Sequence, residues 1–227
     1  MRLKRGYPIR MIKVISFDIG GTLIKFQDDK SLLASLEHAL KVDPSTVKAA
    51  YKEHFVEKRT TFDCFCRQLQ CKFPLEMEVF VERYYEKKSL SSLYDDVLPV
   101  IRMIKNLGYL LITVSNKSYR NPANLSSYGI SQYFDAEVYS YDAGYAKPNI
   151  KIFRYAECII KANPKEILHI GDSVNSDVYG AKIANWQTVF INRSSKKVQQ
   201  QSASPFIEAD YNVTNLNHLL SIIKQMR

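Results

Sequence analysis

An apolar run leads into one carboxylate, two glycines and a threonine in the segment Val14-Ile15-Ser16-Phe17-Asp18-Ile19-Gly20-Gly21-Thr22-Leu23. The apolar residues predict a buried strand, and a short carboxylate directly after such a strand is well placed to be a nucleophile or a metal ligand. Glycines let the backbone turn sharply and approach a phosphate or an ion closely. The segment therefore predicts a site for a charged ligand at the end of a strand.

From Asp95 onward, the sequence alternates between strand and helix patterns. The predicted strands are 110–114, 136–139, 167–170, 188–191 and 209–213, and predicted helices start near residues 97, 121, 148, 174 and 216. Near-continuous apolar strands that alternate with helices are typical of a parallel sheet covered on both faces. The predicted fold class is α/β, with a Rossmann-like parallel sheet, helices on both faces and an inserted all-helical cap.

Three polar side chains follow predicted strands that lie far apart in the sequence. These are Asp18, Ser115 and Asp172. Ligands of open parallel sheets bind beyond the carboxyl ends of the strands, where such residues meet. We therefore expect the three side chains to lie at one edge of the sheet.

The segment from residue 29 to residue 94 shows helical periodicity and no strand signal. Its apolar stripes are Leu32, Leu33, Leu36 and Leu40; Val47, Tyr51 and Phe55; Phe62, Phe65 and Leu69; and Met77, Phe80 and Tyr84. Such stripes favour a helical core of their own over a ligand pocket. The predicted domains are a core of residues 1–28 and 95–227 and a helical cap of residues 29–94.

The bulk composition predicts a globular protein of the cytoplasm. No apolar run approaches the roughly 18 residues that a membrane-spanning helix needs, and no secretory apolar segment follows the basic N-terminus. The net charge of +9 favours an acidic partner. Because the lysines and arginines are scattered, we expect a small phosphorylated substrate, with neither nucleic acid nor membrane as a partner. A monomer and a homodimer both remain open.

Four short motifs occur in a fixed order along the chain. They are Asp18 to Leu23, Ser115-Asn116, Lys147-Pro148, and Gly171-Asp172-Ser173 followed by Asp177. Together they resemble the haloacid dehalogenase-like (HAD) superfamily, over nearly the whole chain. Residues 29–94 match the helical cap that this family carries between its first and second motifs.

The resemblance implies a Mg²⁺-dependent, phosphatase-like hydrolase. In that family, the residue that matches Asp18 attacks phosphorus and forms an aspartyl-phosphate, which divides one difficult displacement into two. Asp18 and Asp172 would bind Mg²⁺ directly, together with the main-chain carbonyl of Gly20, and Asp177 would bind it through water.

The remaining motif residues would hold the substrate. By the same resemblance, Ser115 and Asn116 would bind the phosphate group. The Lys147 ammonium would bind it as well, and would offset the negative charge of Asp18 and of the transferring phosphoryl oxygens. The expected substrate is a small phosphorylated metabolite.

Gly20 departs from the family pattern. Phosphatases of the family carry there an aspartate that protonates the leaving group and then activates water. Losing a general acid–base typically slows a reaction by about 10²- to 10⁴-fold, which raises the barrier by roughly 3 to 5 kcal/mol. The sequence leaves open a slow phosphatase, a phosphotransferase, a phosphonatase-like enzyme, and an inactive protein that binds a phosphorylated ligand or a partner.

Overall fold

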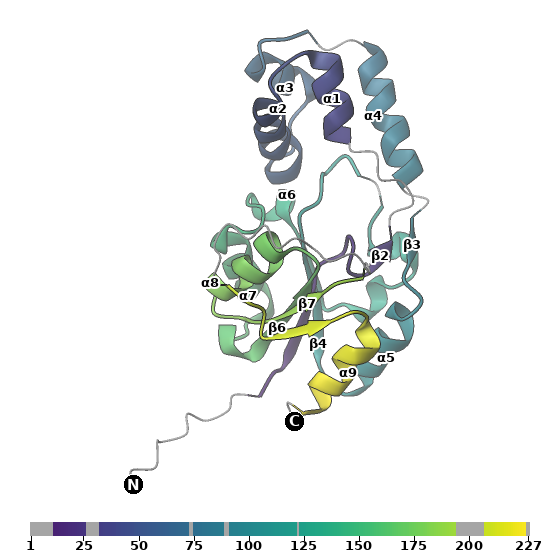
Figure 1. Cartoon of the computed structure of the whole chain (residues 1–227), viewed down its shortest axis with the longest axis vertical. Coiled ribbons are helices and arrows are strands. Elements are labelled where there is room, and N and C mark those ends of the chain that lie inside the picture. The colour runs from purple at the N-terminus through teal and green to yellow at the C-terminus, as the bar shows by residue number, and fades with distance from the viewer. Residues whose placement is uncertain are drawn as a thin grey trace.

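Six parallel strands form the centre of the molecule, in the order β5-β4-β1-β6-β7-β8 (Figure 1). The computed structural model describes residues 11–25, 32–72, 75–88, 91–121, 123–193 and 207–225. The strands are β1 (Val14–Phe17), β4 (Leu110–Ser115), β5 (Ala136–Tyr139), β6 (Ile167–Gly171), β7 (Gln187–Ile191) and β8 (Tyr211–Val213). The predicted parallel α/β sheet is confirmed, and β1 lies inside it with β4 and β6 as neighbours.

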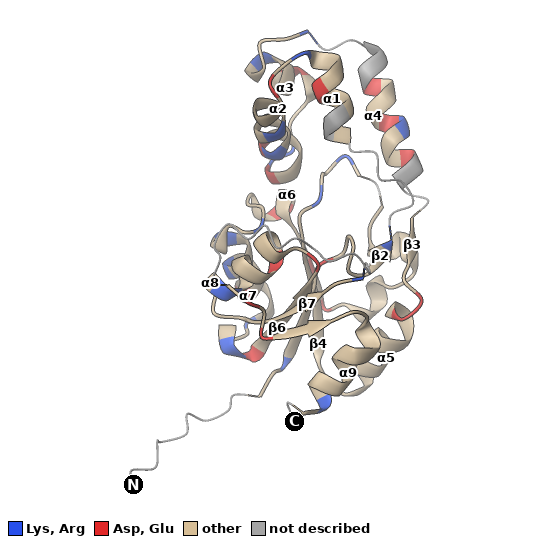
Figure 2. Ribbon diagram, viewed as in Figure 1, with Lys and Arg blue, Asp and Glu red and all other residues tan. Residues whose placement is uncertain are grey.

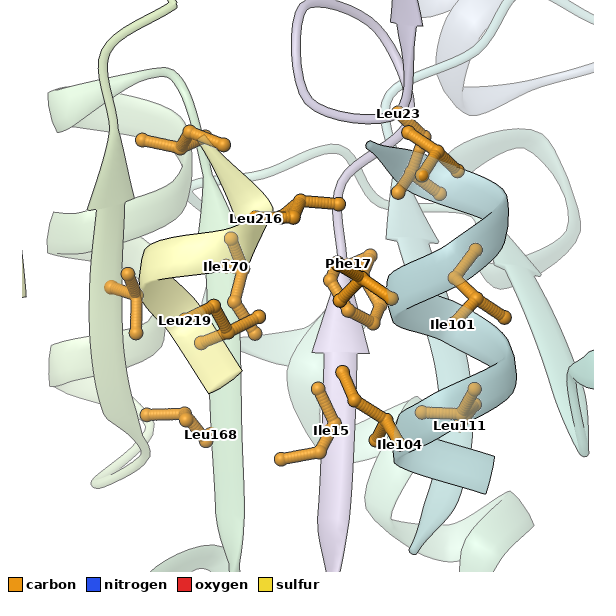
Figure 3. Packing of buried hydrophobic residues seen from close by; sticks show 14 of the residues in the cluster. Ile15, Phe17, Leu23, Ile101, Ile104, Leu111, Leu168, Ile170, Leu216 and Leu219 are labelled. Atoms are coloured by element: carbon orange, nitrogen blue, oxygen red, sulfur yellow. The ribbon is translucent and has the colours of Figure 1, made fainter. Parts of the chain in front are cut away.

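Helices cover both faces of this sheet. On one face α5 (Val97–Asn106) and α9 (Leu216–Gln225) pack against β1 side chains such as Ile15 and Phe17 (Figure 3). On the other face α7 (Ile150–Ile160) and α8 (Gly180–Ile183) contribute to a second buried cluster that includes Val14. Burying one large apolar side chain stabilises a fold by about 1.5–3 kcal/mol, so these two clusters fix β1 between its neighbours.

Short helical segments connect the strands. They are η2 (Leu125–Tyr128), η3 (Ser131–Tyr133), α6 (Ser140–Ala143), η4 (Pro164–Glu166) and η5 (Val174–Tyr179). The helix predicted to start near residue 121 is instead the single 3₁₀ turn η2. Asn124 caps this turn, since its side chain accepts a hydrogen bond from the Ser127 amide, and Gly129 ends it at φ 68°.

A separate group of helices lies beyond the carboxyl ends of the strands (Figure 1). We call residues 32–88 the helical unit. It contains α1 (Leu32–Leu40), α2 (Pro44–Tyr51), the π-helix η1 (Lys52–Glu57), α3 (Phe62–Gln68) and α4 (Leu75–Lys88). Its core forms around Phe55, whose ring centroid lies 4.8 Å from that of Phe62 and 5.2 Å from that of Phe65. The unit thus buries an aromatic cluster of its own, as the stripes predicted.

The apolar stripe predicted for α4 is wrong at Phe80, which is 40% exposed. Tyr84 packs against the core of the unit, and the side chain of Met77 lies outside the described residues. The buried side chains among the described residues of this helix are Val81 and Tyr85. The segment carries apolar residues at 79, 80, 81, 84 and 85, so two stripes fit the helical period equally well. Packing against the other helices of the unit selects the stripe that brings Tyr85 inward.

A two-stranded antiparallel ladder lies where the helical unit joins the core. It pairs β2 (Ile24–Lys25) with β3 (Ser92–Leu93). Strands of two residues give no alternation signal, and the sequence did not predict them. Hydrogen bonds add to this connection, from the Tyr119 amide to the Phe55 carbonyl (2.9 Å) and from the Ala146 amide to Glu57 Oε1 (3.1 Å).

Charged side chains are distributed over both parts of the molecule. Figure 2 shows Lys and Arg interspersed with Asp and Glu on the helical unit and on the core. Within the part of the chain that the structure describes, no helix has the length and apolar character that crossing a membrane would require.

Candidate active site

The three predicted strand-end residues meet at one edge of the sheet. Asp18 follows β1, Ser115 ends β4, and Asp172 follows β6. Both neighbours pair with β1 in parallel, and Phe17 lies opposite Thr113 on one side and Ile170 on the other. Asp177, from the first turn of η5, joins them. Carboxylate oxygens of Asp18, Asp172 and Asp177 all lie within 4.8 Å of one another.

Lys147 carries the positive charge of this cluster. It lies between α6 and α7 and is only 3% exposed. Its Nζ donates to Asp18 Oδ1 (2.7 Å), to Asp177 Oδ1 (2.5 Å) and to the Val114 carbonyl (2.6 Å), which uses all three ammonium protons. Burial would lower the pKa of Lys147, but the two carboxylates outweigh that effect and raise the pKa above its usual value. The side chain is therefore a fixed cation.

The Asn116 side chain holds the Lys147 backbone rather than pointing free into the site. Its Nδ2 donates to the Lys147 carbonyl (2.9 Å), and its Oδ1 accepts from the Lys147 amide (2.7 Å). Both ends of the amide group are thus engaged. The pair of bonds fixes the loop that places the ammonium group between the carboxylates.

Asp177 is held as an anion by its surroundings. Burial would raise its pKa, but Lys147 and then His169 keep it below the usual range. Its Oδ1 lies 3.2 Å from His169 Nε2, and its Oδ2 accepts from the Ser173 amide (2.9 Å). Burial lowers the pKa of His169, so the imidazole is neutral at neutral pH. Because a carboxylate only accepts, the proton is assigned to Nε2, and Nδ1 accepts from Ser16 Oγ (2.9 Å).

Asp172 differs from the other two carboxylates because no cation of the described residues pairs with it. Loss of hydration, and then the charges of Asp18 and Asp177, raise the pKa of Asp172 to about 7, although part of the residue is exposed. The carboxylate lies directly against the Gly21 backbone. A Cβ at Gly21 would stand 2.1 Å from Asp172 Oδ2, and Gly21 has φ +74°. Position 21 thus needs glycine for both space and backbone conformation.

The donor set of this cluster fits a hard divalent cation. It consists of carboxylate oxygens, which Mg²⁺ prefers as ligands. Asp177 uses both of its oxygens in hydrogen bonds to other residues, whereas among the described residues Asp18 bonds through Oδ1 to Lys147 and Asp172 is bonded by its own amide. The arrangement is a possible acidic metal site with Asp18 and Asp172 as its most available ligands.

A cavity of about 290 Å³ lies between this edge of the sheet and the helical unit. On the core side it borders Gly20, Ser115 and Asn116, and it extends along the segment that follows β4. Its lining residues on the helical unit are Leu32, Tyr51, Val56, Tyr84 and Tyr85. The aromatic stripes of the unit therefore form its own core and, through three tyrosines, part of a pocket wall, which the sequence analysis did not expect.

Arg193 is a further residue near the site that the sequence analysis did not identify. It follows β7, donates from Nε to the Thr22 carbonyl (2.8 Å) and pairs with Asp96 through Nη1 (3.0 Å). Its guanidinium lies 3.8 Å from the centre of the Tyr94 ring. Arg193 thereby anchors the turn after Asp18. The strand-end rule that selected Asp18 and Asp172 would also have found it.

Comparisons with known proteins identify the family of the chain. A family model described as haloacid dehalogenase-like hydrolase matches residues 12–185. The chain is 26% identical over 231 residues to a glyceraldehyde 3-phosphate phosphatase of Methanopyrus kandleri, covering 95% of this chain and 99% of that protein.

Solved structures share the fold. A HAD phosphatase from Thermococcus onnurineus superposes with a TM-score of 0.64 and 24% identity, covering 93% of this chain and 98% of that one. A 2-haloacid dehalogenase from Pseudomonas syringae pv. Tomato superposes with a TM-score of 0.68 and 17% identity, covering 96% of this chain and 100% of that one. Since proteins named for two chemistries share one fold, the chemistry has to be argued from the site.

Proposed function

Because the chain belongs to the haloacid dehalogenase-like hydrolase family, we propose that it is a Mg²⁺-dependent phosphatase that acts on a small phosphorylated metabolite. The observation that carries this proposal is the charge arrangement at the sheet edge. Lys147 joins Asp18 to Asp177, while Asp172 has no cation of its own among the described residues. Three clustered carboxylates with one ammonium leave a net negative pocket that favours a divalent cation.

In this proposal Asp18 is the nucleophile. Its Oδ1 accepts from Lys147, which leaves Oδ2 to form the bond to phosphorus while the ester oxygen leaves with the bonding electron pair. Water then attacks the phosphorus of the aspartyl-phosphate and gives up a proton to the solvent, while the bond between phosphorus and the Asp18 oxygen breaks and phosphate is released. Lys147 stays in place through both steps and offsets the negative charge on the phosphoryl oxygens and on Asp18.

Asp18, Asp172 and the main-chain carbonyl of Gly20 would hold the cation directly, and Asp177 would hold it through water. When bound, Mg²⁺ supplies charge neutralisation between an anionic phosphate and an anionic nucleophile. Ser115, at the end of β4 and on the cavity wall, would bind a phosphate oxygen. The Asn116 side chain supports Lys147 in this scheme, and its backbone remains available to the phosphate.

The helical unit would act as the cap. We assign residues 29–94 to it and residues 1–28 and 95–227 to the core, since the cavity lies between the two. A cap that closes over the sheet edge excludes water from the nucleophile. Gly20 offers no side chain to protonate the leaving group, so turnover is slower than in relatives that carry an aspartate there. Glyceraldehyde 3-phosphate, which the Methanopyrus relative is named for, is a first substrate to test.

The test is phosphate release by wild type and by Asp18→Asn, with Mg²⁺ and again with a chelator. The substrates are para-nitrophenyl phosphate, whose leaving group needs no proton, and glyceraldehyde 3-phosphate. We expect wild-type activity that requires Mg²⁺ and falls to background in Asp18→Asn, because an amide cannot form the aspartyl-phosphate. Asp63→Asn, an exposed carboxylate on α3, is the matched control and should keep full activity.

Equal activity in Asp18→Asn and wild type would overturn the proposal. Adding glycerol as an acceptor separates hydrolysis from phosphoryl transfer, since a transferase would form glycerol phosphate instead of free phosphate. Activity that appears only in Gly20→Asp would mean that the natural chain binds a phosphorylated ligand without turning it over.

A further inference from the structure

Three residues with hydroxyl groups that contact one another line the cavity. We propose that Tyr51, Tyr85 and Ser118 recognise the organic part of the substrate, and that this part is a small uncharged hydroxy or carbonyl compound. The inference rests on the proposed phosphatase function and specifies the chemical class of its substrate. Two of the three residues come from the helical unit and one from the segment after β4, so the cluster also spans the boundary between the two parts.

The three hydroxyls are in direct contact. The Tyr51 and Tyr85 hydroxyl oxygens form a short hydrogen bond, and Ser118 bonds to both phenols. Burial raises the pKa of each phenol, that of Tyr51 despite its bonds to Tyr85 and Ser118, so both hydroxyls keep their protons at neutral pH. The cluster therefore offers neutral donors and acceptors to a ligand.

Counting lone pairs leaves the phenol oxygens available as acceptors. Ser118 Oγ donates to one phenol, which donates to the other, and the second phenol can donate back to Ser118 Oγ, whose other lone pair accepts from the Arg120 amide (3.2 Å). Each phenol oxygen then keeps one lone pair, and both tyrosines line the cavity. A ligand hydroxyl would donate to such a lone pair, and a phenol that turns its proton toward the ligand would donate to a carbonyl oxygen.

The charges around the cavity argue against a charged organic part. None of the described cavity-lining residues that belong to the helical unit carries a charge. Lys117 borders the cavity from the core, but its ammonium lies 4.7 Å from the centre of the Tyr139 ring and 5.8 Å from that of Tyr141, and neither ring lines the cavity. Its charge is therefore directed away from the ligand, and a ligand carboxylate would be buried with no cationic partner among the described lining residues, which is costly.

The size of the cavity limits the organic part as well. Its volume of about 290 Å³ is at the lower end of the roughly 300–1,000 Å³ found for small-molecule pockets. Part of that volume would be taken by the phosphate group next to Ser115 and Gly20. The remainder suits a compound of a few carbon atoms rather than a nucleoside or a sugar with a long side chain.

The first experiment compares four phosphate esters with the full-length wild-type chain. Glyceraldehyde 3-phosphate and glycerol 3-phosphate have uncharged organic parts, whereas phosphoglycolate and 3-phosphoglycerate add a carboxylate of similar size. We expect kcat/KM to be at least about 10-fold higher for the uncharged pair, because the added carboxylate is left buried and unpaired. Equal values, or a preference for the carboxylates, would overturn this inference while leaving the phosphatase proposal intact. No hydrolysis of any ester, para-nitrophenyl phosphate included, would instead overturn the phosphatase proposal.

The second experiment removes the phenol oxygens one at a time. Tyr51→Phe and Tyr85→Phe should each lower kcat/KM for glyceraldehyde 3-phosphate by about 3- to 10-fold, the effect of one neutral hydrogen bond. The loss for phosphoglycolate should be smaller, so the preference between the two esters shrinks. The double variant should lose little more than either single one, since both belong to one hydrogen-bonded chain.

Tyr155→Phe on α7 is the matched control and should change neither substrate's kinetics, since Tyr155 is exposed on the core and does not line the cavity. A uniform loss across all esters in Tyr51→Phe and Tyr85→Phe, with an unchanged preference, would identify the pair as merely structural and overturn the inference.

Discussion

The core and the helical unit contribute opposite kinds of chemistry. On the core, at the carboxyl ends of β1 and β6, three carboxylates and one ammonium group lie within a few ångströms, and Lys147 and Asp177 are 3% and 2% exposed. These four residues do not line the cavity themselves, whereas its described lining on the helical-unit side consists of tyrosines and apolar side chains. The difference fits our proposal that fixed charges act on the phosphate group and neutral groups select what is attached to it.

The largest expected effect comes from the charged side. Lys147→Met should lower the free energy of unfolding by about 3–5 kcal/mol, because Asp18 and Asp177 lose their shared partner in a buried environment. It should also abolish phosphatase activity. Urea unfolding of the metal-free protein measures the first effect. Lys151→Met is the control, because the exposed Lys151 ammonium bonds to the Tyr145 hydroxyl (3.3 Å) and lies 4.6 Å from the centre of that ring, with no carboxylate paired to it among the described residues. If Lys147→Met lowered the free energy of unfolding no more than Lys151→Met does, the Lys147 ammonium would not be needed to hold the two carboxylates.

The helical-unit side should respond to a change of volume rather than of charge. Phe55→Ala removes the central ring of the aromatic cluster and should cost about 3 kcal/mol, because a cavity forms where Phe62 and Phe65 packed. Hydrogen exchange should show the loss in α2 and α3, while the strands of the core keep their protection. Equal loss of protection in β1 and β4 would mean that the two parts unfold as one unit, which contradicts the separation drawn above.

The smallest expected effect depends on pH. The folded-state pKa of Asp172, about 7, lies above the ordinary value of 3.8, so the folded protein binds more protons than the unfolded chain between these two values. The free energy of unfolding therefore falls as pH rises from about 4 to 7. Above pH 8 the carboxyl group of Asp172 is fully ionised, and this loss of stability is complete. Asp172→Asn should remove it and stabilise the metal-free protein at pH 8 by about 1 kcal/mol after screening by solvent.

The same variant should gain little at pH 5, where the wild-type carboxyl is still mostly protonated. Urea unfolding at both pH values, with a chelator present, makes the comparison. A stabilisation of equal size at pH 5 and pH 8 would rule out the charge repulsion that we assign to Asp172. Mg²⁺ should stabilise wild type and have a much smaller effect on Asp172→Asn.

The sheet edge was predictable because each of its residues is tied to a strand that the apolar pattern already reveals. Asp18, Ser115 and Asp172 all lie where the sequence placed them. Asp96 occupies the N-cap position of α5, but its side chain makes no capping bond there. Asp96 instead accepts from the Leu216 amide (2.7 Å) and pairs with Arg193, two partners that only the folded topology brings near.

The neutral side of the cavity was much harder to foresee. The apolar residues of α4 allow two stripes, and the choice that turns Tyr85 inward depends on packing against the rest of the helical unit. The contact of Tyr51 and Tyr85 with Ser118 joins three segments that share no sequence pattern. Local periodicity identifies which residues are apolar in a helix, but it does not reveal which of them face a ligand.

The segment that follows β4 has a practical consequence for redesign. It begins after Ser115, where we propose that phosphate binds. It supplies Ser118 to the hydroxyl cluster and touches the helical unit through Tyr119 and Arg120. The Tyr119 amide bonds to the Phe55 carbonyl, and the Arg120 guanidinium lies 4.3 Å from the centre of the Phe62 ring. Anyone who grafts a foreign cap onto this sheet would have to replace residues 116–121 together with the helical unit. If residues 116–121 stayed, their shape would still fit the helices that were removed.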